Sequence, residues 1–138
     1  MFFTLALLLL ACSPKYPTQK ITLTASDGQI AQLHVEIADE PMEWQQGLMR
    51  RKKLVSDGML FVFPGATVQS FWMKDTLMPL DILFFDADGR FVALHRMDPC
   101  TEDPCPVYSS GKPAQYALEV PAGTLPPIAF GDSWKLEY

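Results

Sequence analysis

The feature that most constrains the fold of this chain is a succession of strand-length segments, each followed by a turn signal. Residues 20–24 alternate polar and apolar side chains, Asp27-Gly28 suits a turn with a positive φ, and residues 29–37 alternate again. This arrangement predicts a β-hairpin. The same reasoning predicts further strands at residues 59–63, 69–74, 80–85, 91–97, 116–120 and 133–137.

Only one helix is predicted, over residues 40–46. Asp39 is a favourable N-cap, Pro41 suits the first helical turn, and the helix is expected to stop near Gly47. Many short strands with a single helix favour one compact antiparallel sheet that curls into a barrel or a sandwich. We find no internal repeat and no sign of a second domain, so residues 20–138 are expected to form one mainly β domain.

The charge of the chain argues against nucleic acid as a partner. The sequence has 11 Lys plus Arg against 16 Asp plus Glu, a net charge of -5, and contains no long basic stretch. It also contains no nucleophile elbow, no phosphate-binding glycine loop and no H-E-x-x-H zinc motif. We therefore expect no metal and no cofactor, and whether the protein is an enzyme stays open.

The first residues of the chain predict export. Residues 1–11 are almost entirely apolar, but this run is too short to cross a bilayer as a helix, which takes about 20 residues. It has the length of a signal-peptide core and leads into Leu9-Leu10-Ala11-Cys12, which resembles the lipobox of bacterial lipoproteins. The alternative interpretation is a buried apolar strand with an incidental cysteine.

On the lipoprotein interpretation, residues 1–11 form the signal peptide and Cys12 carries the lipid. The polar, Pro-containing segment that follows predicts a tether over residues 12–19. We then expect the protein at the bacterial cell envelope, held to the membrane through Cys12 and facing the periplasm. Ser13 after the cysteine favours the outer membrane.

The two remaining cysteines predict a local disulfide. Cys100 and Cys105 are separated by four residues and, in an exported protein, lie in a compartment where thiols are oxidised. A redox-active pair is less favoured, because the spacing is wide and no basic residue adjoins either thiol. Zinc is the third alternative, and it lacks a second pair of ligands because His34 and His95 are isolated in the sequence.

Five segments form a pattern that extends through residues 20–138. They are Gly47-Leu48-Met49 with Arg51, Gly58 to Pro64, Phe71 to Thr76 with Pro79 to Ile82, Cys100 to Pro106, and Leu118 to Gly123. In these segments the chain resembles the family called domain of unknown function 192. The resemblance implies a small β-rich domain that is often exported and sometimes lipid-anchored, and it implies no activity. Asp75 stands where the family usually has Asn, and Arg50 stands where an aromatic or apolar residue is common.

A candidate ligand site lies in the central apolar segments, which also carry a few charges. In an extended strand over residues 71–76, Trp72 and Lys74 point to the same side. Trp72 offers a stacking surface and Lys74 offers a cation to an anionic or hydroxyl-bearing ligand. The structural alternative places Trp72 in the core and pairs Lys74 with Asp75 or Asp81. The predicted ligand-binding residues are Arg51, Trp72, Lys74, Asp75 and Asp81.

Three functions are compatible with these residues. The favoured one is an envelope lipoprotein that binds a small molecule or serves as an accessory module for an envelope protein, because no nucleophile–base pair stands out. The second is a hydrolase-like or other enzyme, with Asp81 or Asp75 as base and Lys74 as electrostatic stabiliser. The third is copper handling through Met side chains and His95, since His95 and Met97 lie on the same face of a predicted strand.

Overall fold

The computed structural model describes residues 16–126 and 134–138. Within them, seven strands form one sheet in the order β5-β4-β6-β3-β2-β1-β7. The fold is mainly β with one short helix, as the sequence predicts. In chain order the elements are β1 (Thr18–Thr24), β2 (Ile30–Ala38), α1 (Pro41–Gln46), β3 (Gly58–Trp72), β4 (Leu80–Phe85), β5 (Phe91–Met97), β6 (Val107–Pro121) and β7 (Lys135–Glu137).

The predicted hairpin and helix form from local signals. β1 and β2 pair antiparallel, and Gly28 takes a φ of 87° in the turn between them, which glycine adopts without steric cost. The helix begins after Glu40 rather than Asp39 and ends at Gly47. The side chain of Glu43 accepts hydrogen bonds from the backbone N–H groups of Asp39 and Glu40, which ties the first turn.

The sheet departs from the predicted antiparallel arrangement between β2 and β3, which run parallel. Val35–Ala38 lie beside Gly58–Phe61 in that pair, whereas the other strand pairs are antiparallel. Parallel neighbours require a crossover connection, and α1 with the loop after it supplies this crossover. The parallel pair therefore explains why the helix lies against the sheet at this position.

The predicted end of a strand at Pro64-Gly65 is wrong. β3 continues to Trp72, so the strands expected at residues 59–63 and 69–74 are one strand. The pairing of β3 with β6 shifts register between Val62 and Thr67, and this irregularity accommodates a proline that has no N–H to donate. β6 is correspondingly long, and it starts at Val107, well before the predicted strand.

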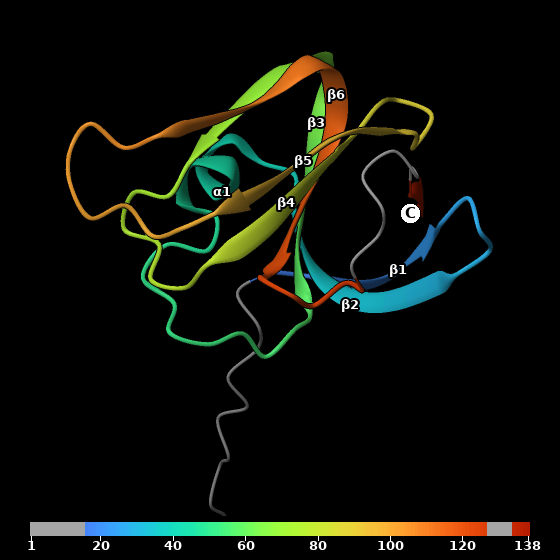
Figure 1. Cartoon of the computed structure of the whole chain (residues 1–138), viewed down its shortest axis with the longest axis horizontal. Coiled ribbons are helices and arrows are strands. Elements are labelled where there is room, and N and C mark those ends of the chain that lie inside the picture. The colour runs from blue at the N-terminus through green and yellow to red at the C-terminus, as the bar shows by residue number, and fades with distance from the viewer. Residues whose placement is uncertain (1–15, 127–133) are drawn as a thin grey trace, which may run out of the picture.

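The sheet curls strongly (Figure 1), and its two edges approach one another. The backbone N–H of Leu136 in β7 donates to the carbonyl of Gly89, just before β5, at 2.8 Å. Arg90 and Lys135 also form an isolated bridge. Figure 1 shows β3 and β6 running through the middle of the molecule, with α1 on one side and β1 and β2 on the other. The sheet is thus curled towards a barrel.

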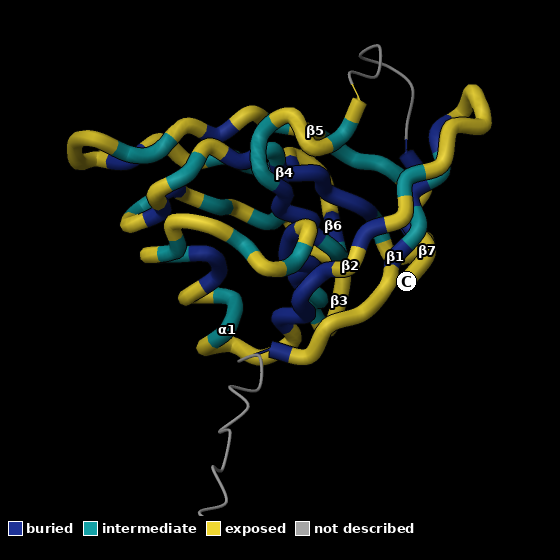
Figure 2. Tube along the Cα trace, turned by 90° about the horizontal axis from the view of Figure 1, so that it is seen from below, coloured by how far each residue is buried: buried dark blue, intermediate teal, exposed yellow. Residues whose placement is uncertain are grey.

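Alternate residues of the central strands fill two hydrophobic clusters on opposite faces of the sheet. Leu60 and Leu118 belong to one cluster, whereas Met59, Phe61 and Ala117 belong to the other. This alternation follows from the period of two in a strand. Figure 2 shows the buried residues concentrated where β2, β3, β4 and β6 cross the centre, with exposed loops around them.

The folded domain begins earlier than predicted. Tyr16 is 1% exposed within the second cluster, and β1 starts at Thr18, so residues 16–19 belong to the domain and not to the predicted tether. Cys12 and the predicted signal peptide lie outside the described residues. The predicted strand at 133–137 is observed as β7, and Ser133 also lies outside. Among the described residues, none of the helices has the length and apolarity to span a bilayer.

Candidate ligand-binding pocket

A pocket of about 620 Å³ lies between α1, the loop that follows it, and the strands β3 and β6. This volume is in the range that holds small-molecule ligands. The parallel crossover creates it, because the crossover lays α1 over the sheet face that carries the second hydrophobic cluster. The lining residues are Pro41, Trp44, Gln45, Gln46, Gly47, Leu48, Met49, Phe61, Phe63, Gln69, Ser70, Phe71, Trp72, Thr76 and Glu119.

Aromatic side chains make up much of the wall. The ring centroids of Trp44 and Phe63 are 5.1 Å apart, and those of Phe61 and Phe71 are 5.0 Å apart in an edge-to-face contact. The indole N–H of Trp44 donates to the carbonyl of Ala38 at 3.0 Å, which fixes α1 over the sheet. These contacts pack the aromatic rings against one another and against the sheet in the absence of a ligand.

Glu119 is the residue that distinguishes this pocket. It lies on β6 directly opposite Met59 on β3 and Ile82 on β4, both of them buried apolar residues, and it is itself only 5% exposed. Throughout residues 16–126 and 134–138, its carboxyl group has neither a hydrogen-bond partner nor an ion-pair partner. Burial therefore raises the pKa of Glu119 to about 8.

The remaining polar groups of the wall are neutral. Gln45, Gln46 and Gln69 contribute amides, and Ser70 and Thr76 contribute hydroxyl groups. Among the lining residues that the structure describes, Glu119 is the only one with an ionisable side chain. The pocket thus offers one carboxyl group, several neutral hydrogen-bonding groups and an apolar wall.

Among the residues predicted as a ligand site, Trp72 is the one that lines this pocket, with half of its surface exposed. Lys74 lies just beyond the end of β3, and its Nζ is 2.9 Å from Oδ1 of Asp103. This hydrogen bond raises the pKa of Lys74. Asp103 lies between Cys100 and Cys105, in the loop closed by their disulfide. Lys74 therefore pairs with neither Asp75 nor Asp81, the partners of the structural alternative.

Arg51 and Asp81 lie in two further ion pairs. The Arg51 guanidinium donates to both carboxylate oxygens of Glu36, at 2.7 and 2.9 Å. Asp81 pairs with Arg96 on the neighbouring strand and accepts a hydrogen bond from the backbone N–H of Gly123. The structure therefore holds Arg51, Asp81 and Lys74 in three separate ion pairs. Lys74 and Asp75, the other base of the enzyme hypothesis, line one smaller cavity beside the disulfide loop.

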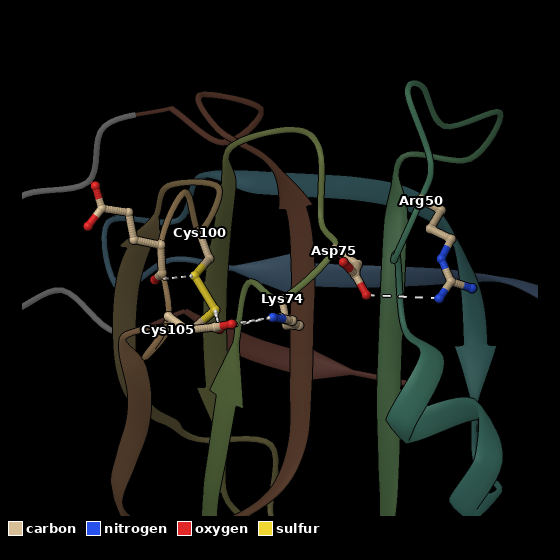
Figure 3. A network of polar contacts seen from close by, with 7 residues as sticks. Arg50, Lys74, Asp75, Cys100 and Cys105 are labelled. Atoms are coloured by element: carbon tan, nitrogen blue, oxygen red, sulfur yellow. Dashed lines mark hydrogen bonds and ion pairs between the residues drawn. A yellow bond between two sulfur atoms is a disulfide. The ribbon is translucent and has the colours of Figure 1, made fainter.

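Backbone conformation accounts for the presence of Asp at position 75. Asp75 has a φ of 53° and Arg50 a φ of 62°, both in the left-handed region. Asn and Asp tolerate this region better than other residues with a side chain. The backbone N–H of Arg50 donates to the carbonyl of Asp75 at 2.7 Å, and their charged groups lie 3.9 Å apart (Figure 3). The residue type at position 75 is thus accounted for without a ligand.

The disulfide between Cys100 and Cys105 is present, with an S–S distance of 2.12 Å. Both sulfurs lie near a carboxylate oxygen of Asp103, but thiols joined in a disulfide are not available as zinc ligands.

His95, the residue of the copper hypothesis, has its Nε2 atom 2.7 Å from the carbonyl of Ser109. Met97 is fully buried in the second cluster.

A comparison with family models matches residues 22–135 to DUF192, described as an uncharacterised ACR. The chain belongs to the DUF192 family. A solved structure from Sinorhizobium meliloti, described as a candidate transcription regulator, is 36% identical with a TM-score of 0.76, covering 88% of this chain and 94% of that one. A protein of unknown function from Novosphingobium aromaticivorans is 27% identical with a TM-score of 0.76, covering 88% and 85%. Curated proteins give no match.

Sequence reasoning overlooked Glu119, although it stands in the Leu118–Gly123 segment that carries the DUF192 resemblance. The available signal was a lone carboxyl group between Leu118 and Val120 in a strand of mostly apolar residues. Its place in a pocket depends on α1, which is more than 70 residues away along the chain. Only the folded structure brings the two together.

Proposed function

We propose that this DUF192 protein is a small-ligand-binding module that is anchored at the bacterial cell envelope through lipidated Cys12. The observation that carries the proposal is the unpaired Glu119 carboxyl in an aromatic pocket of about 620 Å³. An ionisable group placed among apolar residues costs free energy, and such groups cluster at functional sites. A ligand with a complementary polar group would supply the missing partner.

Binding fits the geometry better than the alternatives. The enzyme hypothesis used Lys74 as stabiliser and Asp81 or Asp75 as base. These three charged groups are taken up in ion pairs with Asp103, Arg96 and Arg50, respectively. A role in transcription, as described for the Sinorhizobium meliloti protein, fits poorly with a net charge of -5. The predicted export signal of residues 1–11 supports an envelope location, and the envelope is where small molecules enter the cell.

The test is binding of the uncharged fluorophore N-phenylnaphthylamine to the purified protein. We expect saturable binding to one site, with fluorescence that rises as the fluorophore enters the apolar pocket. Ser70→Trp places an indole at the rim of the pocket on an exposed residue, so this variant should fold normally and lose binding. Ala66→Trp is the matched control, because Ala66 is exposed on the same strand and does not line the pocket.

The proposal predicts that wild type and Ala66→Trp bind the fluorophore alike. Equal binding by Ser70→Trp, or no saturable binding by the wild type, would contradict it. Circular dichroism of the variants establishes that any loss of binding is not a loss of fold.

A further inference from the structure

We propose that the pocket recognises an organic ammonium ion, with its cationic nitrogen beside Glu119 and its carbon groups against the aromatic wall. This inference rests on the proposed function and specifies the chemical class of the ligand. It is carried by the combination of one buried, unpartnered carboxyl group with several aromatic rings.

The charge of the wall selects against anions. Glu119 is the only ionisable residue among the described lining residues, so a phosphate or carboxylate ligand would meet no cation and would meet a carboxyl group. An ammonium ion, in contrast, neutralises an ionised Glu119 at close range in a poorly solvated site. The net charge of -5 also favours the approach of cations over that of anions.

The aromatic wall supplies the second half of the recognition. The faces of aromatic rings carry partial negative charge and attract cations within about 6 Å of the ring centre. The rings of Trp44, Phe63 and Phe71 form one continuous cluster, with centroids 5.1 and 6.4 Å apart, and all three line the same pocket as Glu119. The rings also bury the methyl or methylene groups that surround an alkylammonium nitrogen.

The elements around Glu119 bring no competing charge. Its neighbours are Met59 on β3 and Ile82 on β4, and α1 contributes Trp44 and two glutamines to the lining. Glu43 on α1 is held at the helix N-terminus by its hydrogen bonds to Asp39 and Glu40. Glu36 lies one strand beyond Met59 in the same row and is paired with Arg51. His95 lies one strand beyond Ile82 in the same row, with its Nε2 atom 2.7 Å from the carbonyl of Ser109. Among the described lining residues, Glu119 is the one that can exchange a proton with a ligand.

A cation and a proton compete for this carboxyl group, which gives the inference a distinctive signature. The pKa of Glu119 is about 8, so near neutral pH a cation must displace a proton in order to bind. As the pH is raised towards about 8, the apparent affinity for the cation should increase by about ten-fold per pH unit. Above about pH 8 the affinity should level off. An uncharged ligand that accepts a hydrogen bond from protonated Glu119 should show the opposite trend.

The experiment is displacement of N-phenylnaphthylamine by choline, which stays cationic at every pH. The matched probe is the uncharged isostere of choline, in which a quaternary carbon replaces the nitrogen. Benzylamine and benzyl alcohol form a second pair that tests a primary ammonium. We expect at least one cation to compete at least ten-fold better than its isostere at about pH 8, with affinity increasing from about pH 6 to pH 8.

Glu119→Gln keeps the shape of the side chain and removes the ionisable group, so it should lower the affinity for the cation by about ten-fold or more and abolish its pH dependence. Glu137→Gln makes the same change on an exposed residue of β7 and should leave both unchanged. Retained binding of the fluorophore by Glu119→Gln would show that the pocket is intact.

Two outcomes would overturn the inference while leaving the proposed function in place. In the first, the fluorophore binds the pocket but no cation competes better than its isostere. In the second, affinity falls as the pH rises towards about 8. Failure of the fluorophore to bind the wild type would instead contradict the proposed function itself.

Discussion

Glu119 should make the stability of the protein depend on pH in an identifiable way. Folding raises the pKa of this carboxyl from its ordinary value of 4.5 to about 8, so between these values the folded state holds a proton that the unfolded state releases. The contribution of protonated Glu119 to the free energy of unfolding is fully present below about pH 4.5 and is lost as the pH rises through about 8. The slope contributed by one group approaches about 1.4 kcal/mol per pH unit.

We therefore expect Glu119→Gln to gain stability relative to the wild type as the pH is raised. The difference in the free energy of unfolding should be small near pH 5 and reach a few kcal/mol near pH 8, because an amide has no proton to lose. Urea unfolding followed by circular dichroism at several pH values measures it. Other titrating groups are common to both proteins, so a difference that stays constant with pH would refute the assignment.

Arg51 should act mainly through stability. It donates two hydrogen bonds to Glu36, which is 8% exposed, and its guanidinium lies over the ring of Tyr16, 5.3 Å from the centroid. Arg51→Met leaves the Glu36 carboxylate buried with Ser56 as its remaining partner, and we expect a loss of about 2–3 kcal/mol. Arg50→Met is the control, because the Arg50 side chain is 80% exposed and should change stability by less than about 0.5 kcal/mol. Equal losses in urea unfolding would argue against this role.

The sequence identified Lys74 and Arg51 as charged residues in apolar segments, but it did not predict the residues that they pair with. The sequence offered Lys74 either to a ligand or to Asp75 or Asp81, yet its partner Asp103 is 29 positions away. Arg51 was assigned to a ligand, yet it pairs with Glu36 on β2. Ion pairs form between elements that the fold brings together, and the periodicity of one segment contains no information about its neighbours.

At the scale of elements, the packing of β3 against β6 depends on a close approach of the two backbones at Gly58. A Cβ atom on Gly58 would lie 2.2 Å from the carbonyl oxygen of Glu119 and 2.9 Å from Cγ1 of Val120. Gly58→Ala must therefore push β6 away at the point where it carries the pocket carboxyl, and we expect a loss of about 3 kcal/mol in the free energy of unfolding. Fluorophore binding should weaken as well.

Gly65→Ala is the matched control on the same strand, because a Cβ atom there would have nothing within 4 Å. It should change stability by less than about 1 kcal/mol. Similar midpoints of urea unfolding for the two variants would contradict the close approach.

The elements that the sequence predicted well are those set by local signals. The β1–β2 hairpin follows from alternation on either side of Asp27-Gly28, and α1 follows from Pro41 and Gly47. The continuation of β3 past Pro64-Gly65 was missed, because it depends on pairing with a distant strand that tolerates a bulge. The pocket was missed for the same reason, since α1, β3 and β6 are not consecutive in the chain.

For the whole molecule, the main prediction is its attachment to the membrane through Cys12. Two or more acyl chains hold a protein stably at a bilayer where one chain does not. In fractionated bacteria, the wild type should appear in the membrane pellet with an added lipid mass, and Cys12→Ala should lose both. Ser13→Ala keeps the modified cysteine and should stay with the membranes. Equal partition of the wild type and Cys12→Ala, without lipid on the wild type, would disprove the anchor.

The pairing of β7 with β1 limits the order in which the sheet can form during synthesis. Thr22–Thr24 in β1 meet Lys135–Glu137 in β7, so this pairing joins opposite ends of the described chain. During synthesis or passage through a translocation channel, β1 and β2 can pair as soon as residue 38 emerges. The other edge of β1 can pair with β7 only after residue 137 has emerged. Until β7 has been synthesised, a nascent chain therefore exposes unpaired backbone N–H and C=O groups along β1. Such an edge can pair with strands of other chains and promote aggregation.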